Sequence, residues 1–346
     1  MLSSIISRSR PMTLFAAATE GLPRCVVIAT GGTVAMRPDP RSGAPVPALS
    51  GEELVASVPQ LLGLARLDVR SVFNVPSVEM GPARWLALRQ ALLAALDDDE
   101  VCGIVVTHGT DLLEETAWFL ALTLPAECPV VLTGAMRHAA ESQFDGPRNL
   151  LDAVRVAISP SARGMGVLVV MDGEVYCARE AEKSHTTETS AFRRGPGIEL
   201  GAIGAEGPAF WRKPRPHPRI EPAGGDMPRV DIVPMFGGAD GLPIRWAVQS
   251  GARGVVVQAV GAGNVSAAMY TELLNALEAG VMVVVATRVR GGRSQPVYGF
   301  LGGGTLLAQA GAIFSGGLSP QKARILLMLA LQPRWSTAQV RELFDF

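Results

Sequence analysis

Short runs of apolar residues alternate along the chain with longer segments of helical periodicity. In the first half the apolar runs are Val26–Thr30, Ile104–Thr107, Val130–Thr133 and Val167–Met171. Helical periodicity occurs between or after these runs, at residues 85–96, 114–122 and 149–158. Strands that alternate with helices are typical of a parallel sheet with helices on its faces. We therefore predict an α/β fold.

The alternation breaks at residues 211–222, which read WRKPRPHPRIEP. The prolines in this stretch exclude a helix or a central strand, so we interpret it as part of a linker. After Pro228 the alternation resumes, with strands predicted at Val230–Val233, Gly254–Val260 and Val281–Thr287 and helices at 266–279 and 320–331. The predicted organisation is a disordered extension over 1–22, a larger domain over 23–210, a linker over 211–228 and a smaller domain over 229–346.

Two of the predicted strands end in the same way. Val26–Thr30 continues into Gly31-Gly32-Thr33, and Ile104–Thr107 continues into His108-Gly109-Thr110-Asp111. The carboxyl ends of parallel strands form the ligand crevice of an open α/β sheet, so both threonines are expected in one cleft. A hydroxyl beside a carboxylate suggests a nucleophile with activating partners, which indicates an enzyme more than a binding module.

Each of these residues also has a structural interpretation. Thr33 could cap an ordinary turn, and Asp111 could cap a helix that begins near Leu112. Lys183 could act as a base only in a dry cleft with a partner, and is otherwise a solvated lysine. Asp145 and Asn149 are interpreted as turn and cap residues.

Composition narrows the range of functions. The 346 residues suffice for two domains with full cores, and the formal net charge of -1 argues against a nucleic-acid partner. No apolar run approaches the ~18 residues of a membrane span, and residues 1–22 make a poor signal peptide. The cysteines are scattered and are interpreted as free thiols of a reducing, cytoplasmic compartment: Cys25, Cys102, Cys128 and Cys177.

Other chemistries lack their signatures. The histidines do not have metal-ligand spacing, and neither a GxSxG elbow nor a phosphate-binding loop is present, so no metal is expected. Gly261-Ala-Gly263 lies between a predicted strand and helix but lacks the third glycine of a dinucleotide fingerprint. A dinucleotide-dependent oxidoreductase is therefore a weak alternative.

Taken together, several strings resemble the L-asparaginase family of bacterial asparaginases and glutaminase-asparaginases. They are ATGGTVA (29–35), THGTDLLEETA (107–117), VVLTGAMR (130–137), DGPRNLLDA (145–153), EKSHTT (182–187) and LSPQKARILLMLAL (318–331). The resemblance extends from about Pro23 onward in the family's order. It implies a flavodoxin-like N-terminal domain and a smaller C-terminal α/β domain. It also implies a homotetramer or homodimer with active sites shared between subunits.

The resemblance implies an amidohydrolase that converts L-asparagine to L-aspartate and ammonia without a metal or organic cofactor. Thr33 corresponds to the nucleophile. Thr110, Asp111 and Lys183 correspond to a second triad, in which the lysine draws the threonine proton and the aspartate meets the substrate ammonium. Which triad acts in which half-reaction stays open. The implied substrate-binding residues are Gly32, Ser77, Val78, Gly109 and, from a neighbouring subunit, Asn264.

The chain departs from the family pattern in three places. Residues 36–49 lack the tyrosine that often assists the first threonine, and Val78 replaces a glutamine that holds the amino-acid head. Residues 287–298 lack a glutamate that neighbours supply in some members, and Tyr298 is the hydroxyl-bearing aromatic that could replace it.

These departures keep other readings open. The alternatives are a glutaminase-asparaginase, a related small-amide hydrolase and a non-catalytic amino-acid-binding homologue. A tRNA-dependent amidotransferase subunit would be expected to carry a further N-terminal domain and a basic face.

Overall fold

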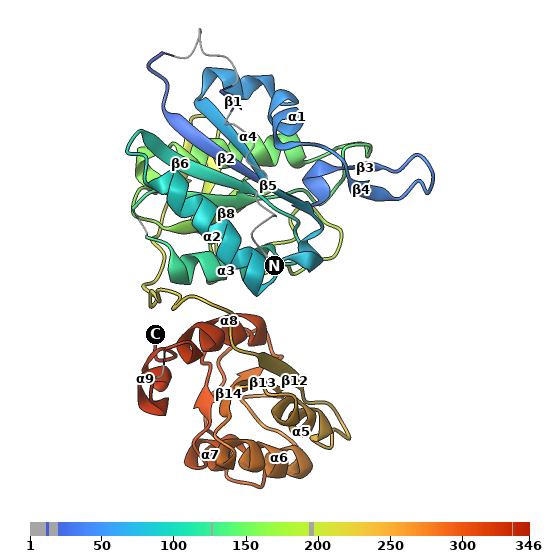
Figure 1. Ribbon diagram of the computed structural model, residues 1–346, viewed down its shortest axis with the longest axis vertical. Helices are drawn as coiled ribbons and strands as arrows, with labels where there is room; N and C mark the ends of the chain where they lie inside the picture. Colours follow the sequence, from blue (N-terminus) through green and yellow to red (C-terminus); the bar gives the residue numbers. More distant parts are fainter. Residues whose placement is uncertain (1–11, 14–19, 126, 194–196, 334) are drawn as a thin grey trace. The chain divides into compact units, whose positions relative to one another are not determined.

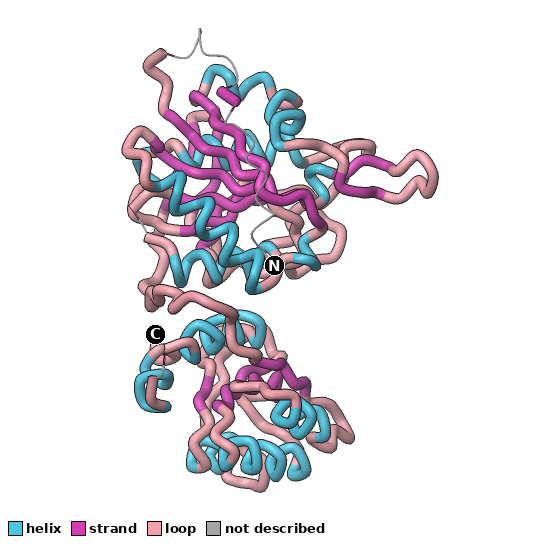
Figure 2. The backbone as a smooth tube through the Cα atoms, in the orientation of Figure 1, coloured by secondary structure: helices cyan, strands magenta, loops and turns pink. Residues whose placement is uncertain are grey.

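The computed structural model describes residues 12–13, 20–125, 127–193, 197–333 and 335–346. The chain divides into two compact units, Met1–Arg215 and Pro216–Phe346, and each is described by itself (Figures 1 and 2). The division falls inside the segment 211–228, where the structure has neither helix nor strand. Most of the predicted N-terminal extension lies outside the described residues.

The first unit is built on five parallel strands. They are β2 (Arg24–Gly31), β5 (Arg66–Val75), β6 (Val101–Thr107), β7 (Val130–Thr133) and β8 (Val167–Met171). Their order across the sheet is β5-β2-β6-β7-β8. Counted along the chain, this is the flavodoxin-like order 2-1-3-4-5, which confirms the predicted fold. The order reverses between β2 and β6, and a ligand crevice is expected where strand order reverses.

Antiparallel strands extend the sheet at both edges. Beyond β8 lie β9 (Glu174–Cys177), β10 (Gly201–Gly204) and β11 (Gly207–Phe210). Beyond β5 lies β1, in which Met12 pairs with Val69 and Thr13 with Asp68. The extension was expected to be disordered, so this short strand corrects the prediction at these two residues, where the open edge of β5 offers backbone partners.

Helices cover both faces of this sheet (Figure 1). α1 (Gly51–Ala56) and α4 (Gly146–Ala157) form one core with the strands. α2 (Pro82–Leu96) and α3 (Leu113–Thr123) cover the other face, where the rings of Trp85 and Phe119 stack with centroids 5.5 Å apart. Among the described residues of this unit, short 3-10 helices lie at Thr33–Ala35, Pro59–Gly63, Ser77–Glu79 and Pro160–Ala162.

The segment that follows Thr33 forms a projecting hairpin (Figure 1). β3 (Met36–Pro38) pairs with β4 (Pro45–Pro47) in antiparallel fashion. At its tip the Asp39 carboxylate accepts the backbone amides of Arg41 and Ser42, and these hydrogen bonds lower the pKa of Asp39. Within residues 36–49, Met36–Pro38 and Pro45–Pro47 are thus paired strands.

The second unit is a smaller α/β layer structure. Its parallel strands lie in chain order: β12 (Val230–Pro234), β13 (Gly254–Ala259), β14 (Met282–Thr287) and β15 (Ile313–Phe314). α5 (Leu242–Gln249), α6 (Ala267–Glu278) and α7 (Gly304–Gln309) contribute to the core on one face. α8 (Pro320–Leu331) packs on the other face, and α9 (Thr337–Glu342) follows it.

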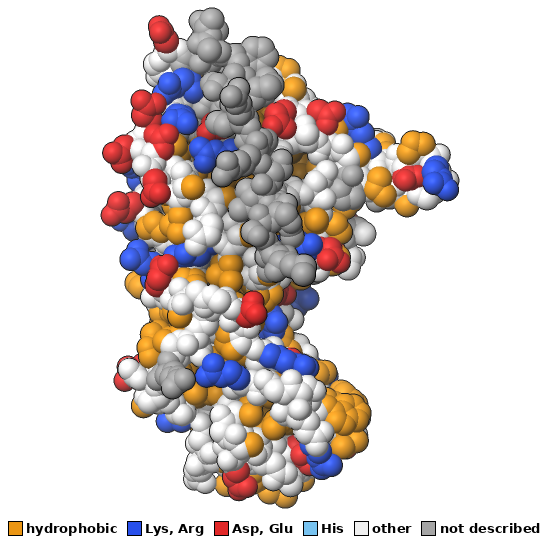
Figure 3. Space-filling model, viewed as in Figure 1, with side chains coloured by type: hydrophobic (Ala, Val, Ile, Leu, Met, Phe, Trp, Pro, Cys, Tyr) orange, Lys and Arg blue, Asp and Glu red, His pale blue; other side chains and the backbone are white. Residues whose placement is uncertain are grey.

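Two surface properties bear on function. On the face drawn in Figure 3, acidic and basic side chains of the first unit lie interspersed, which produces no large field of one sign. Within the described part of the chain, no helix combines the length and apolarity that a bilayer crossing requires.

Candidate active site

Three neighbouring strands of the first unit end side by side. Gly31 at the end of β2 pairs with Val75 at the end of β5, and Ala29 of β2 pairs with Thr107 of β6. The Thr30 hydroxyl donates a hydrogen bond of 2.8 Å to the carbonyl oxygen of Thr107, which further ties β2 to β6. The residues that follow these strand ends therefore meet at the edge where the strand order reverses.

The glycines after β2 and β6 allow the two strand ends to approach closely. Gly32 has φ 85° and ψ -178°, a conformation that is essentially restricted to glycine. A β-carbon on Gly32 would overlap the amide nitrogen of Gly109, and a β-carbon on Gly109 would stand 2.8 Å from the Ser77 Oγ. Ser77 itself is buried. The structure thus brings Gly32, Gly109 and Ser77 into one packed group.

Thr33 follows this group directly. It is half-buried and begins a 3-10 turn whose next two residues, Val34 and Ala35, are buried. The Gly32 amide donates to the Val75 carbonyl at 3.1 Å, so the chain is hydrogen-bonded on the residue before Thr33. This turn fixes the backbone of Thr33 at the strand-end edge.

Lys183 joins the residues after β6. Its Nζ donates a 2.9 Å hydrogen bond to Thr110 Oγ1 and lies 2.6 Å from Asp111 Oδ1. The lysine side chain is 16 % exposed and the aspartate side chain 63 %, while Thr110 is buried. The amine therefore lies between a buried hydroxyl and a carboxylate that opens to solvent.

The contact between Lys183 and Asp111 shows which of the interpretations given above holds for each of these two residues. α3 begins at Leu113, with Leu112 in the capping position and no side-chain capping bond, so Asp111 is not its cap. Its carboxylate binds the Lys183 ammonium instead. Lys183 is correspondingly a paired and mostly buried lysine, not a solvated one.

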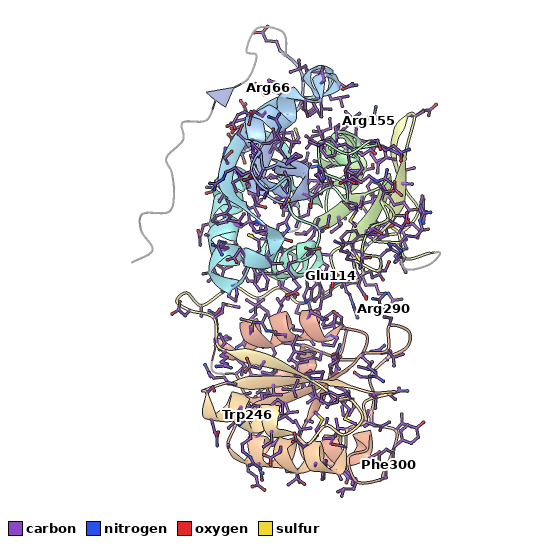
Figure 4. The ribbon with its side chains drawn as sticks, turned by 90° about the vertical axis from the view of Figure 1, so that its right-hand side faces the viewer. Arg66, Glu114, Arg155, Trp246, Arg290 and Phe300 are labelled. Atoms are coloured by element: carbon purple, nitrogen blue, oxygen red, sulfur yellow. The ribbon has the colours of Figure 1, made fainter. Side chains whose placement is uncertain are left out.

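Glu114 is a site residue that sequence reasoning missed. Its Oε2 accepts a 2.5 Å hydrogen bond from the backbone amide of Lys183, and it lies in the first turn of α3 (Figure 4). In the sequence a glutamate there is explained by the helix dipole alone. The contact spans 69 residues, so local patterning contains no signal for it.

His108 supports the same strand end from inside the fold. Its ring is buried between the Gly109 carbonyl, 2.7 Å from Nδ1, and the Thr116 hydroxyl, 2.9 Å from Nε2. Trp85 Nε1 donates to the same hydroxyl at 2.9 Å. Burial lowers the pKa of His108 to about 4, so the ring is neutral near pH 7. Because a carbonyl only accepts, Nδ1 carries the proton and Nε2 accepts from Thr116.

The remaining predicted residues lie apart from this group or in the second unit. Val78 directly follows Ser77, but it is 64 % exposed. Asn264 lies in the turn between β13 and α6, and its Oδ1 is buried without a hydrogen-bond partner among the described residues. Tyr298 is exposed, with its ring centroid 6.0 Å from that of Phe300. The relation of Asn264 and Tyr298 to the first-unit group stays a prediction.

Two further observations bear on cofactors. Ser266 occupies the third position of the incomplete glycine fingerprint, and its Oγ caps α6 by accepting the Met269 amide at 3.1 Å. Ser266 is therefore a helix-capping residue at the position where the fingerprint has its third glycine. Over the described residues, no three His, Cys, Asp or Glu side chains gather as a metal site would require. The four cysteines, all among the described residues, form no disulfide with one another.

Comparison with known proteins gives matches over almost the whole chain. Residues 24–215 match the family described as "Asparaginase, N-terminal", and residues 229–344 match "Glutaminase/Asparaginase C-terminal domain". A probable L-asparaginase of Deinococcus radiodurans is 41% identical over 333 residues, covering 93% of this chain and 97% of that protein. L-asparaginase 2 of Escherichia coli is 35% identical, covering 96% and 95%.

Two further proteins are similar to this chain. One is a relative whose name includes a second substrate, and the other is a protein of solved structure. The glutaminase-asparaginase of Pseudomonas aeruginosa is 31% identical, covering 94% of this chain and 91% of the relative. The crystal structure of a probable cytoplasmic L-asparaginase from Campylobacter jejuni matches with a TM-score of 0.84 at 30% identity. That match covers 93% of this chain and 98% of the other.

Proposed function

This chain belongs to the asparaginase family, and on that premise we propose that it hydrolyses the side-chain amide of L-asparagine to L-aspartate and ammonia. One observation carries the proposal in this chain. The Lys183 amine contacts both the Thr110 hydroxyl and the Asp111 carboxylate, at the strand-end edge that also holds Thr33. In this arrangement the amine can exchange a proton with the hydroxyl while the carboxylate orients it, which is the kind of activation that acyl transfer uses.

In the first half-reaction the Thr33 oxygen attacks the carbon of the substrate carboxamide. The hydroxyl proton passes to a base, and the carbonyl oxygen becomes an oxyanion beside the backbone N–H groups of the glycine-rich turns. The C–N bond then breaks as the nitrogen takes a proton and leaves as ammonia. An ester between Thr33 and the β-carboxyl group of the aspartyl residue is left.

In the second half-reaction a water attacks the ester carbon and gives up a proton. The bond between that carbon and the Thr33 oxygen breaks, the hydroxyl recovers its proton, and L-aspartate departs. Lys183 and Thr110 supply the proton path, because their polar atoms are 2.9 Å apart. In the alternative mechanism, Thr33 and Thr110 exchange roles between the two half-reactions. Variants of each threonine distinguish the two mechanisms.

The amino-acid head of the substrate needs partners for its two charges. The Asp111 carboxylate, exposed on one side, meets the ammonium, and the buried Ser77 hydroxyl meets the carboxylate. Val78 contributes no hydrogen-bonding side chain where the family often has glutamine. Glutamine is the second candidate substrate, because one relative is named a glutaminase-asparaginase.

We extend the proposal to a homotetramer or homodimer in which Asn264 completes a neighbour's site. The Asn264 residue is half-buried and its Oδ1 is buried and unpartnered among the described residues, so the side chain must turn outward to offer this acceptor to a neighbour's substrate. Large apolar side chains are also exposed on the second unit, among them Trp246 and Phe300 (Figure 4). Contiguous apolar patches are typical of interaction surfaces, and the exposed residues next to Phe300 in the sequence are Val297, Tyr298 and Leu301.

We propose a cytoplasmic location because the four cysteines form no disulfide with one another and because the similar Campylobacter jejuni protein is named cytoplasmic. A Haemophilus influenzae relative is named periplasmic, so cell fractionation is the deciding test.

The test of the function is ammonia release from L-Asn, L-Gln, D-Asn and short β-aspartyl amides. L-Asn is expected to give the largest kcat/KM. Thr33→Ala should reduce kcat at least about 10³-fold, while Thr33→Ser retains a hydroxyl and part of the activity. If the wild-type protein released no ammonia yet bound L-Asn in calorimetry, the non-catalytic amino-acid-binding reading would replace this one.

A further inference from the structure

The turn that follows β7 lies directly against Thr110. The His108 amide donates to the Thr133 carbonyl at 2.8 Å, which is the last rung between β6 and the end of β7. A β-carbon on the next residue, Gly134, would overlap the His108 carbonyl oxygen and stand 3.2 Å from the Thr110 Cγ2. The position of this turn, Gly134–Arg137, therefore limits where the Thr110 side chain can lie.

Two side chains at the start of α4 hold that turn. Asp145 accepts the Met136 amide on Oδ2 and the Arg137 amide on Oδ1, both at 3.0 Å. Asn149 donates from Nδ2 to the Gly134 carbonyl at 3.0 Å and to Asp145 Oδ2 at 3.0 Å. Both residues were expected to be local turn and cap residues. The Asp145 side chain makes no capping bond to α4 and instead reaches back to the turn.

The other end of the Asn149 amide holds a second turn. Its Oδ1 accepts the backbone amide of Asp172 at 3.1 Å. Asp172 and Gly173 have φ of 51° and 76° and form the two-residue turn between β8 and β9. The chain that leaves β9 at Cys177 reaches Lys183 a few residues later. Asn149 thus donates to the turn after β7, which lies against Thr110. It accepts from the turn after β8, which precedes the segment that carries Lys183.

Asn149 is 1 % exposed, and both the oxygen and the nitrogen of its amide are hydrogen-bonded. A buried amide whose donors and acceptor are all satisfied is rigid, because each alternative orientation leaves a polar group unpaired. Its rigidity is transmitted to both turns at once. A displacement of about 1 Å in a catalytic pair can reduce the rate by ~10²-fold.

We propose that Asn149 is a positioning residue, which sets the Thr110–Lys183 contact by fixing the turns after β7 and β8. It acts through these turns and contacts neither of the two residues. The inference rests on the proposed function for its kinetic effect, and on the hydrogen bonds of the turns for its structural effect. The experiment below reads the two effects separately.

The main variant is Asn149→Asp, which is nearly isosteric. It keeps an oxygen for the Asp172 amide, loses the donor to the Gly134 carbonyl and places a second carboxyl group beside Asp145. Asn149→Ser, which adds no charge, is the second variant if the first fails to fold. Asp152→Asn is the matched control, since Asp152 is also buried on α4 but pairs with Arg148 and Arg155 of the same helix.

Three measurements are made on each variant of the full-length protein. Amide hydrogen exchange of the peptides that contain Met136, Arg137 and Asp172 should accelerate about tenfold in the Asn149 variants and not in the control. The rate of Lys183 acetylation by acetic anhydride, followed by mass spectrometry, should rise as its contacts loosen. The kcat for ammonia release should fall ~10- to 100-fold with KM within about threefold of wild type.

The outcomes are distinguishable. Unchanged exchange in the turn peptides overturns the proposal, because Asn149 then does not hold the turns. Faster exchange with Lys183 acetylation and kcat both like the control also overturns it, because the turns then do not set the pair. If the wild type released no ammonia, the proposed function would fail, while exchange and acetylation would still decide the positioning role.

Discussion

Gly32 and Gly109 lie with their backbones in contact, so that a β-carbon on Gly32 would overlap the Gly109 amide nitrogen. The contact joins the segment that carries Thr33 to the segment that carries Thr110. Since it is made by main-chain atoms, side-chain rotation cannot alter it. The two hydroxyl-bearing segments are therefore fixed relative to each other by the sheet itself.

Substituting Gly32 should disrupt both stability and activity. Gly32→Ala forces alanine into a backbone conformation that only glycine adopts and also creates the overlap with Gly109, so the free energy of unfolding should fall by about 3 kcal/mol or more. The control is Gly43→Ala, where φ is 69° but no atom lies within 4 Å. That change should cost about 1 kcal/mol and leave ammonia release intact. The two variants are compared by urea unfolding and by kcat. Equal losses in Gly32→Ala and Gly43→Ala would show that the Gly32–Gly109 contact is unimportant.

Removing the Lys183 amine should abolish most of the activity. Lys183→Met keeps much of the side-chain volume but leaves Thr110 without its proton partner, so kcat should fall ~10²–10⁴-fold. Stability should change little, by less than about 1 kcal/mol, because the Asp111 side chain left behind is 63 % exposed. Lys213→Met, at an exposed lysine, is the control. Efficient asparagine hydrolysis by Lys183→Met would show that the second triad is structural.

Stability should decline on the acid side because of His108. Burial lowers the pKa of this ring from 6.5 in the unfolded chain to about 4. Between these values the unfolded state binds the proton and the folded state does not, so stability rises with pH there. The contribution is fully present above pH 6.5, falls as the pH drops toward 4, and amounts to ~3 kcal/mol.

The His108 effect is measured as the urea midpoint at pH 7.0 and at pH 5.0. In wild type the free energy of unfolding should be lower at pH 5.0, and His108→Gln, which has no proton to gain, should lose this part of the pH dependence. An unchanged slope in His108→Gln would assign the acid sensitivity to other groups.

Sharing of sites between chains can be tested by complementation. Thr33→Ala and Asn264→Ala are each expected to be nearly inactive. Mixed oligomers should regain part of the activity, because some sites then combine an intact first unit with an intact Asn264 from the partner. Mixed assemblies confirmed by native mass spectrometry but without recovered activity would mean that each chain builds its own site.

The strands that the sequence predicts are those with buried apolar runs. β2, β6, β7 and β8 are covered on both faces, so their residues are apolar almost without interruption. β5 is missing from the prediction because it reads RLDVRSVFNV. Its polar Asp68 is buried and pairs with Arg70 of the same strand and with Arg24 of β2, and the Arg24 contact exists only in the folded sheet.

The candidate site shows the same limit. The sequence predicts Thr33, Thr110 and Asp111 as site residues because each lies next to a predicted strand. The partners that organise them come from far along the chain, as with Glu114 and the Lys183 amide, or Asn149 and the Asp172 amide. Sequence patterning explains such residues by their nearest neighbours, as helix-dipole or cap residues. Their long-range hydrogen bonds depend on tertiary structure.

The parallel arrangement of the first unit also has a consequence for how the protein becomes active. The proposed site residues Thr33, Ser77, Thr110 and Lys183 are separated by long stretches of chain. The strands that carry the first three pair across non-adjacent segments, and the Thr110–Lys183 contact spans 73 residues. Loop-closure entropy makes such non-local pairing slow. During refolding, the return of ammonia release should therefore lag behind the return of helical circular dichroism. The appearance of ammonia release would therefore mark the completion of the sheet. A chain still under synthesis, from which Lys183 has not yet left the ribosome, would have no active site.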